Sequence, residues 1–104
     1  MPILQLSAAK GPAECEQAVK YSFEELLKDA KKHQIEIKIL EKTETVYGYS
    51  SILLQLDQAH LIWTKTWCGT IQWTFQSIIR PNHKRKNWFV GIKLFDDPQT
   101  LPEN

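Results

Sequence analysis

The segment from Arg80 to Trp88, RPNHKRKNW, concentrates the side chains of this sequence that are best suited to binding an anion. It holds four permanent cations and one histidine, and it has no acidic residue. The whole chain has 13 basic and 12 acidic side chains, so the residues outside the segment carry 9 basic groups against 12 acidic ones. Lysine and arginine neutralise phosphate, and the planar guanidinium grips phosphate oxygens in pairs. This clustering favours RNA or another polyanion over a loop whose charges only meet water.

The residue types in the segment suggest separate roles in RNA binding. The cations are expected to contact phosphates: Arg80, Lys84, Arg85 and Lys86. His83 and Asn87 can hydrogen-bond to base edges, and Trp88 can either stack on a base or anchor a strand in the core. For Trp88 taken alone, the core is favoured. We also expect Trp63, Trp67 and Trp73 to be core or interface residues, in preference to a stacking platform.

Nothing in the sequence indicates a catalytic centre, a metal site or a cofactor. The two cysteines, Cys15 and Cys68, are far apart and are expected to be free thiols. The three histidines show no metal-ligand spacing, and the four glycines are isolated, so there is no phosphate-binding glycine loop. No apolar run approaches the roughly 20 residues that span a bilayer, and the start of the chain does not resemble a signal peptide. We therefore expect a cytoplasmic protein that does not bind membranes.

Hydrophobic periodicity predicts the elements that position these residues. An amphipathic helix is expected from about Pro12 to Lys32, with Cys15, Ala18, Val19, Ser22, Leu26 and Ala30 on its buried face and Phe23 and Leu27 widening that stripe. The predicted strands are 3–6, 35–41, 51–56, 69–77 and 87–95. Apolar and charged residues alternate in 35–41, so this strand is expected to have one wet face. In 87–95 one face is expected to hold Trp88, Val90, Ile92 and Leu94, and the other Phe89 and Phe95. Segment 42–50 is expected to be a loop or an irregular edge, segment 61–67 fits either a helix or a strand, and residues 96–104 are expected to be a tail or linker.

This order of elements predicts an α+β fold, in which one long helix packs on a mostly antiparallel sheet. The 104 residues are expected to form a single domain over residues 1–95, followed by a linker or tail over 96–104. The basic segment then lies in a long connection between the last two strands. Loops held by two firm strands often carry function.

Two stretches of the sequence resemble the codon-recognition domain of bacterial class I peptide chain release factors. The first is ILQLSAAKGPAECEQAVKYSFEELLKDA followed by IEIKILE, which is similar to the opening strand, helix and strand of that domain. The second, CGTIQW followed by RPNHKRKNWFVGIKLF, is closer to one branch of the family, peptide chain release factor H. Together they cover residues 3–95.

The resemblance implies a module that enters the ribosomal A site and contacts small-subunit rRNA at the decoding centre, with mRNA as a candidate further partner. The loop after the strand 69–77 would lie there. Stop-codon readers carry Pro-x-Thr or Ser-Pro-Phe at a position that here reads Ser77-Ile78-Ile79, so reading of a stop codon is not implied. Ser77 joins the expected RNA-binding residues on this basis. The release factor H branch is associated with rescue of ribosomes whose decoding-centre RNA has been cut.

Release factors hydrolyse peptidyl-tRNA with a separate domain that bears a Gly-Gly-Gln motif, and these 104 residues contain no such motif. The resemblance therefore implies a recognition module that is not itself an enzyme and that could work with a separately encoded Gly-Gly-Gln domain. The alternative is a protein-interaction module, whose apolar tryptophan surface pairs with a catalytic half or another partner chain.

Overall fold

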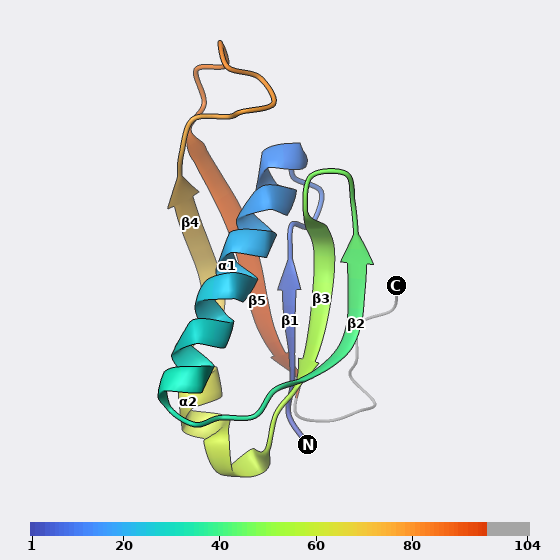
Figure 1. Ribbon diagram of the computed structural model, residues 1–104, viewed down its shortest axis with the longest axis vertical. Helices are drawn as coiled ribbons and strands as arrows, with labels where there is room; N and C mark the ends of the chain where they lie inside the picture. The colour runs from blue at the N-terminus through green and yellow to red at the C-terminus, as the bar shows by residue number, and fades with distance from the viewer. Residues whose placement is uncertain (96–104) are drawn as a thin grey trace.

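The computed structural model describes residues 1–95, which form one helix-covered sheet (Figure 1). The strands are β1 (Ile3–Ser7), β2 (Lys38–Glu44), β3 (Tyr49–Gln55), β4 (Gly69–Thr74) and β5 (Asn87–Phe95). The helices are α1 (Ala13–Lys32), a short 3-10 turn η1 (Gln58–His60) and α2 (Leu61–Thr66). The expected α+β architecture, with one long helix on an antiparallel sheet, is confirmed. The expected tail over 96–104 lies outside the described residues.

The five strands form one antiparallel sheet in the order β2-β3-β1-β5-β4. The first strand of the chain is therefore the central one, and Leu4 pairs with Leu54 on one side and with Leu94 on the other. Side chains alternate between the two faces of a strand, so one set of strand residues faces α1 and the other set forms the opposite face of the sheet. We call that opposite surface the open face.

The helix α1 begins where the sequence predicts, with Pro12 at its N-cap and Glu14 and Glu16 in its first turn. The acidic groups near the N-terminus, and the basic Lys31 and Lys32 in the last turn, both stabilise the helix by interacting favourably with its dipole. All six residues of the predicted buried face are buried, as is Phe23. The expected stripe is too wide only at Leu27, which is 37% exposed because it points past the edge of the contact with the sheet.

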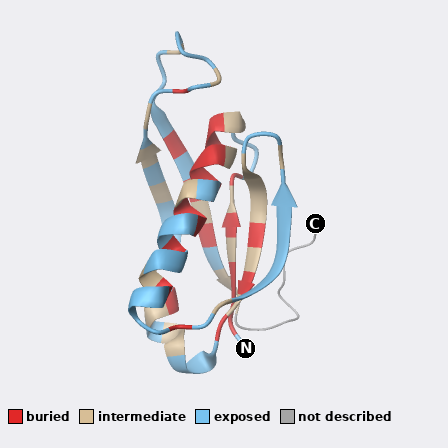
Figure 2. Ribbon diagram, in the orientation of Figure 1, coloured by how far each residue is buried: buried red, intermediate tan, exposed pale blue. Residues whose placement is uncertain are grey.

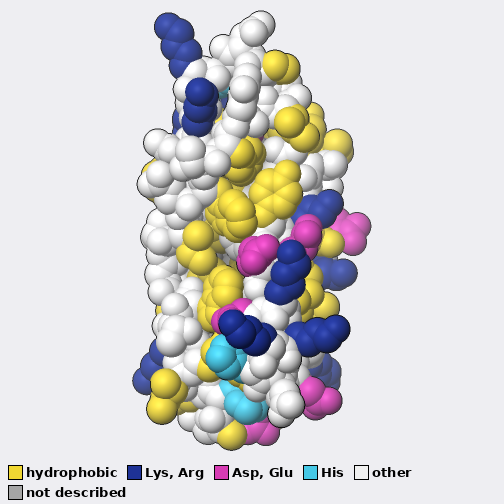
Figure 3. Space-filling model, turned by 60° about the vertical axis from the view of Figure 1, so that its left-hand side comes forward, with side chains coloured by type: hydrophobic (Ala, Val, Ile, Leu, Met, Phe, Trp, Pro, Cys, Tyr) yellow, Lys and Arg dark blue, Asp and Glu magenta, His cyan; other side chains and the backbone are white. Residues whose placement is uncertain are grey.

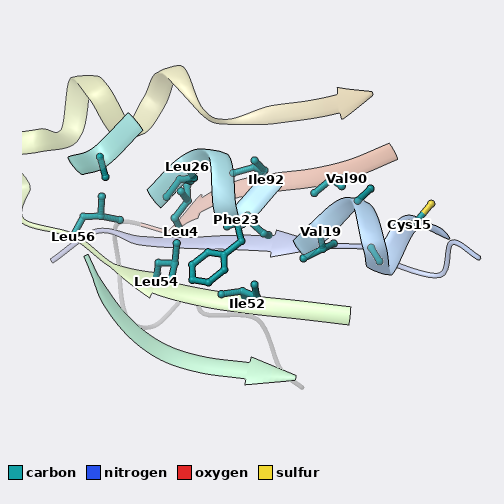
Figure 4. Packing of buried hydrophobic residues seen from close by; sticks show 14 of the residues in the cluster. Leu4, Cys15, Val19, Phe23, Leu26, Ile52, Leu54, Leu56, Val90 and Ile92 are labelled. Atoms are coloured by element: carbon teal, nitrogen blue, oxygen red, sulfur yellow. The ribbon is translucent and has the colours of Figure 1, made fainter. Parts of the chain in front are cut away.

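The core fills the space between α1 and the sheet (Figure 4). The helix contributes Val19 and Leu26, and the central strand contributes Leu4, all of them fully buried. Seven buried residues of β1, β3 and β5 face α1: Leu4, Leu6, Ile52, Leu54, Trp88, Val90 and Ile92. Alternation along β5 was predicted correctly, since Trp88, Val90 and Ile92 are buried while Phe89 is exposed.

The second strand differs from its prediction. The segment 35–41 was expected to be a strand with one wet face, but β2 begins at Lys38 and all seven of its residues are exposed. The helix ends at Lys32, and the chain turns through Gln34 with a φ of 58° before it reaches the sheet. Ile35 is buried in this crossing and not in the strand. As an edge strand beyond the reach of α1, β2 has neither face covered.

Of the two alternatives expected for 42–50, the structure has the irregular edge, because most of the segment is paired in the sheet with a register shift between Thr43 and Glu44. Residues 42–44 pair with β3, and Tyr49 already belongs to β3, so the connection is a short hairpin turn. In that turn Thr45 N donates to Gly48 O at 2.9 Å. A Cβ at Gly48 would lie 2.3 Å from the carbonyl oxygen of Glu16, so the turn packs directly on the backbone of α1. A polar composition is compatible with this strand, because backbone pairing at the edge of a sheet does not require apolar side chains.

The ambiguous segment 61–67 is helical, as α2 and its cap. Trp63 and Trp67 both donate their indole N–H to one carboxylate oxygen of Asp29 on α1, at 2.9 and 3.0 Å. The hydrogen bond from Trp67, followed by that from Trp63, holds the pKa of Asp29 below its ordinary value. Both rings, and that of Trp73, are partly buried against the core, as expected.

Candidate nucleic-acid interface

The basic segment belongs to a long loop, residues 75–86, that joins β4 to β5 and projects beyond the end of the sheet (Figure 1). The predicted strand 69–77 is shorter than expected, because β4 ends at Thr74. The base of the loop is nevertheless closed by backbone, since Phe75 N donates to Lys86 O at 2.9 Å. The indole of Trp88 adds a second tie by donating to Phe75 O at 2.9 Å. The loop is therefore held firmly at its base and exposed over most of its length (Figure 2).

One side of the loop is attached to the first turn of α1 through Glu14, whose side chain is 1% exposed. Arg80 donates to both oxygens of this carboxylate, from Nε at 2.9 Å and from Nη2 at 2.8 Å. Ser77 Oγ donates to the same carboxylate at 2.6 Å and accepts from the backbone N–H of Arg80 at 2.9 Å. Two-pronged pairs between arginine and a carboxylate are stronger and more directional than single contacts. The Glu14–Ser77–Arg80 cluster therefore fixes how the loop leaves the sheet.

The cluster also sets the charge state of its buried carboxyl. The hydrogen bond from Arg80 is the main cause that lowers the pKa of Glu14 from its ordinary 4.5 to about 2, with Ser77 contributing and burial opposing. The same contact raises the pKa of Arg80. Glu14 is thus ionised at neutral pH although its side chain is almost fully buried. Arg80 and Ser77 make this possible, since a charge buried without partners would be far more costly.

A second group of contacts orders the far limb of the loop. Arg85 donates from Nε to Asn87 O at 2.9 Å, and its guanidinium lies 4.9 Å from the ring centre of Trp88. The ring of His83 lies 6.1 Å from the same indole, and His83 Nδ1 accepts from the backbone N–H of Arg85 at 3.0 Å. Cation–π stacking of this kind still leaves the outer edge of a guanidinium available to a phosphate.

The structure separates the expected site residues into an exposed set and a set that is buried or bonded to Glu14. Lys84, Arg85, Lys86 and Asn87 are exposed, and no acidic group among residues 1–95 pairs with Lys84 or Lys86. His83 is half-buried. Figure 3 shows Lys and Arg side chains at the same end of the molecule as this loop.

Three expected contacts need correction. Trp88 is fully buried, so its indole cannot stack on a base, and the core role favoured for it is the one observed. Ser77 is also buried and directs its hydroxyl to Glu14, away from solvent. Arg80 spends two of its donor groups on Glu14, so it is not a free phosphate ligand like the lysines. Glu14 is the reason that Ser77 and Arg80 are not available to RNA. The loop still presents three cations that have no acidic partner among residues 1–95: Lys84, Arg85 and Lys86.

Sequence reasoning missed Glu14, which stands 66 positions before Arg80 in the chain. Its place in the first turn of α1 looked like an ordinary favourable interaction with the helix dipole. A weak signal existed, because Glu14 lies directly beside Cys15 on the face predicted to be buried. Among residues 1–95 no cluster of His, Cys, Asp and Glu could hold a metal ion. Within the same range, no helix is both long and apolar enough to cross a membrane.

Known proteins resemble this chain in sequence and in fold. No family model matches the chain. A protein of Escherichia coli described as "Peptide chain release factor homolog" is 42% identical over 99 residues, which is 91% of this chain and 48% of that protein. The structure of RF2 of Thermus thermophilus superposes with a TM-score of 0.75 over 89% of this chain and 27% of RF2, at 13% identity.

At this low identity the likeness to RF2 establishes the fold alone. The evidence for relatedness is the sequence match to the Escherichia coli protein. Fold and sequence together show a release-factor-like domain. The chain spans about half the length of the curated relative it matches, at 48%.

Proposed function

We propose that this chain is the ribosome-binding recognition module of a cytoplasmic, release-factor-H-like translation factor, which acts in termination or in rescue of damaged ribosomes. Residues 1–95 would form the recognition-type domain. Its loop over 75–86 would contact small-subunit rRNA at the decoding centre, with mRNA as a possible neighbour. The observation that carries the proposal is a braced, projecting loop that presents Lys84, Arg85 and Lys86 without an acidic partner among the described residues.

Charge and rigidity both support RNA as the ligand of the loop. Phosphate neutralisation supplies much of the affinity of proteins for nucleic acid. A loop that is ordered before binding loses less conformational entropy when it binds. The two ties of the loop, through Arg80 to Glu14 and through Trp88 to Phe75, supply that order. The relative's description as a peptide chain release factor homolog supports the ribosome as the carrier of this RNA.

Binding to isolated 30S subunits tests the proposal. The variant Lys84→Glu, Arg85→Glu, Lys86→Glu should lose binding while its far-UV circular dichroism and melting temperature stay close to those of the parent. A matched control reverses three exposed lysines at the opposite end of the molecule: Lys28, Lys38 and Lys65. The control should bind like the parent. If the loop variant also binds like the parent, the loop is not the RNA-binding element.

Salt dependence provides a second measure. Three phosphate contacts predict a slope of log affinity against log salt of about −2 to −3. Raising the salt from about 50 to about 200 mM would then weaken binding by roughly 20- to 40-fold. Apolar association would show no such loss.

We further propose that these 104 residues by themselves bind ribosomes without hydrolysing peptidyl-tRNA, because that reaction needs a Gly-Gly-Gln domain outside them. The sequence contains no Gly-Gly-Gln motif, which in release factors serves the hydrolysis. A release assay on ribosomes that carry labelled peptidyl-tRNA tests this directly. Release above the buffer blank would contradict it, and competition with an intact release factor for the A site would support it.

A protein-interaction module is the second candidate, because one surface beside the loop is apolar. Tyr21, Trp73, Phe75 and Ile78 line a shallow hollow between α1 and β4, and Ile78 is 74% exposed. Figure 3 shows hydrophobic side chains gathered on this side of the molecule, below the basic end. If this surface mediates the function, Ile78→Asp should abolish association with a partner chain, and high salt should not.

A further inference from the structure

The open face of the sheet carries an exposed aromatic ring where β5 lies beside β4. Phe89 is 44% exposed and points away from α1, since its neighbours Trp88 and Val90 face the core. Its cross-strand partner in the register is Gln72, and the next pair toward the loop is Thr74 with Asn87. All four side chains are exposed. An exposed ring beside uncharged polar groups therefore lies directly below the base of the basic loop.

The polar groups around this ring are organised. Asn87 Oδ1 accepts hydrogen bonds from Gln72 Nε2 and from Thr74 Oγ1, both at 3.2 Å. These bonds fix the carboxamide, and within residues 1–95 its nitrogen has no protein acceptor. Asn87 thus presents two N–H donors to solvent beside Phe89. Carboxamides in such positions are able to read the edges of unpaired bases.

Among residues 1–95, the surface next to the ring is flat and free of negative charge. Gly91 is the next residue of β5 on the open face, and the nearest atom to a Cβ built there is Ser7 O at 4.0 Å, so the floor beside Phe89 lacks a side chain. The strands β1, β3, β4 and β5 contain no Asp or Glu, whereas the edge strand β2 contains Glu41 and Glu44.

Cations flank this surface at both ends. Lys93 is exposed on the open face four residues beyond Phe89, which is about 13 Å along a strand. Lys86 precedes Asn87 at the other end. A ring for stacking, amide donors for base edges and flanking cations for phosphates are the parts of a single-stranded RNA platform on a sheet.

We propose that Phe89 and Asn87 form a stacking site for an unpaired RNA nucleotide, which continues the RNA path from the basic loop onto the open face. The proposal rests on the proposed RNA-binding function and extends it to a second surface. The loop supplies charge, and the platform supplies a contact that does not depend on salt. Stacking tolerates any base, because every base has a π face.

The test uses an unstructured, fluorescently labelled RNA of about 12 nucleotides, a length that stacking sites of this kind cover. Phe89→Ala should weaken binding by about 5- to 150-fold, which corresponds to the 1–3 kcal/mol that stacking of one base on an aromatic ring is worth. Phe89→Trp should retain the affinity. The matched control is Tyr47→Ala, which removes a ring of like exposure, 43%, from the β2–β3 turn and should change nothing.

The salt slope of Phe89→Ala should equal that of the parent, since no phosphate contact is removed. Cross-linking of a 4-thiouridine form of the same RNA gives a readout that does not depend on variants, and the cross-link should map to residues 87–93. Unchanged affinity in Phe89→Ala, or cross-links confined to other segments, would overturn the stacking site.

The outcomes separate this proposal from the proposed function. Loss of RNA binding in the loop variant alone would contradict the stacking site and support the loop as the RNA-binding element. Loss of RNA binding in Phe89→Ala alone would contradict the proposed role of the loop and support the stacking site. Phe89→Ala that weakens 30S binding but not RNA binding would mean that the face takes a protein, and it would overturn the stacking site.

Discussion

Arg80 in the β4–β5 loop holds both carboxylate oxygens of Glu14 in the first turn of α1, at 2.9 and 2.8 Å. The pair is unequal in burial, because the Glu14 side chain is 1% exposed and that of Arg80 is 45% exposed. This inequality determines what each substitution should do.

We expect Arg80→Met to destabilise the protein more than Glu14→Gln. Losing Arg80 leaves a buried carboxylate short of partners, which costs about 1–3 kcal/mol or more. Losing the charge of Glu14 leaves a guanidinium that can turn to solvent. Urea unfolding of both variants and of the double variant measures this, and the coupling between them gives the pair's own contribution. Equal losses in the two single variants would show that the burial of Glu14 does not govern the pair.

The same carboxylate predicts a pH dependence. Because the pKa of Glu14 is lowered from 4.5 to about 2 in the folded protein, its contribution to stability is fully present above about pH 4.5. That contribution is lost as the pH falls from about 4.5 through about 2, since the unfolded state then binds the proton more readily. The difference in unfolding free energy between the parent and Glu14→Gln should therefore shrink over this range. A difference that stays constant would contradict the assigned ion pair.

The β2–β3 turn should not tolerate a side chain at Gly48. A Cβ there would lie 2.3 Å from Glu16 O, and backbone cannot move aside as a flexible side chain does. Gly48→Ala is expected to lower the free energy of unfolding by about 1–3 kcal/mol. Gly91→Ala is the control, because its Cβ would meet nothing closer than 4.0 Å. Thermal unfolding compares the two, and a Gly48→Ala protein as stable as Gly91→Ala would show that the turn does not pack on the helix.

Two adjacent leucines of α1 test the packing of its face. Leu26 is 0% exposed and Leu27 is 37% exposed. Leu26→Ala should cost about 2–5 kcal/mol, because it removes buried methyl groups and leaves a cavity. Leu27→Ala should cost much less, since Leu27 keeps contact with water. A loss below about 0.5 kcal/mol for Leu26→Ala, the range typical of surface changes, would mean that the other face of the helix is buried.

The sequence alone determined the elements whose periodicity is read locally. The spacing of apolar residues predicted α1 and its six buried positions, and alternation predicted which side of β5 faces the core. These predictions succeeded because a helix or strand that buries one face must repeat apolar residues at its own period. The edge strand β2 carries no such pattern, since all its residues are exposed, and its bounds were wrong for that reason.

The composition of the loop likewise identified the candidate surface, because clustered cations do not need a fold to be recognised. Only the tertiary structure decided which of them are free. Glu14 lies 66 positions from Arg80, and a contact at that separation exists only once the helix N-terminus and the loop base meet at one end of the sheet. The same packing buries Ser77 and Trp88 and leaves Phe89 on the open face, because successive residues of a strand point to opposite sides and the fold alone chooses which side α1 covers.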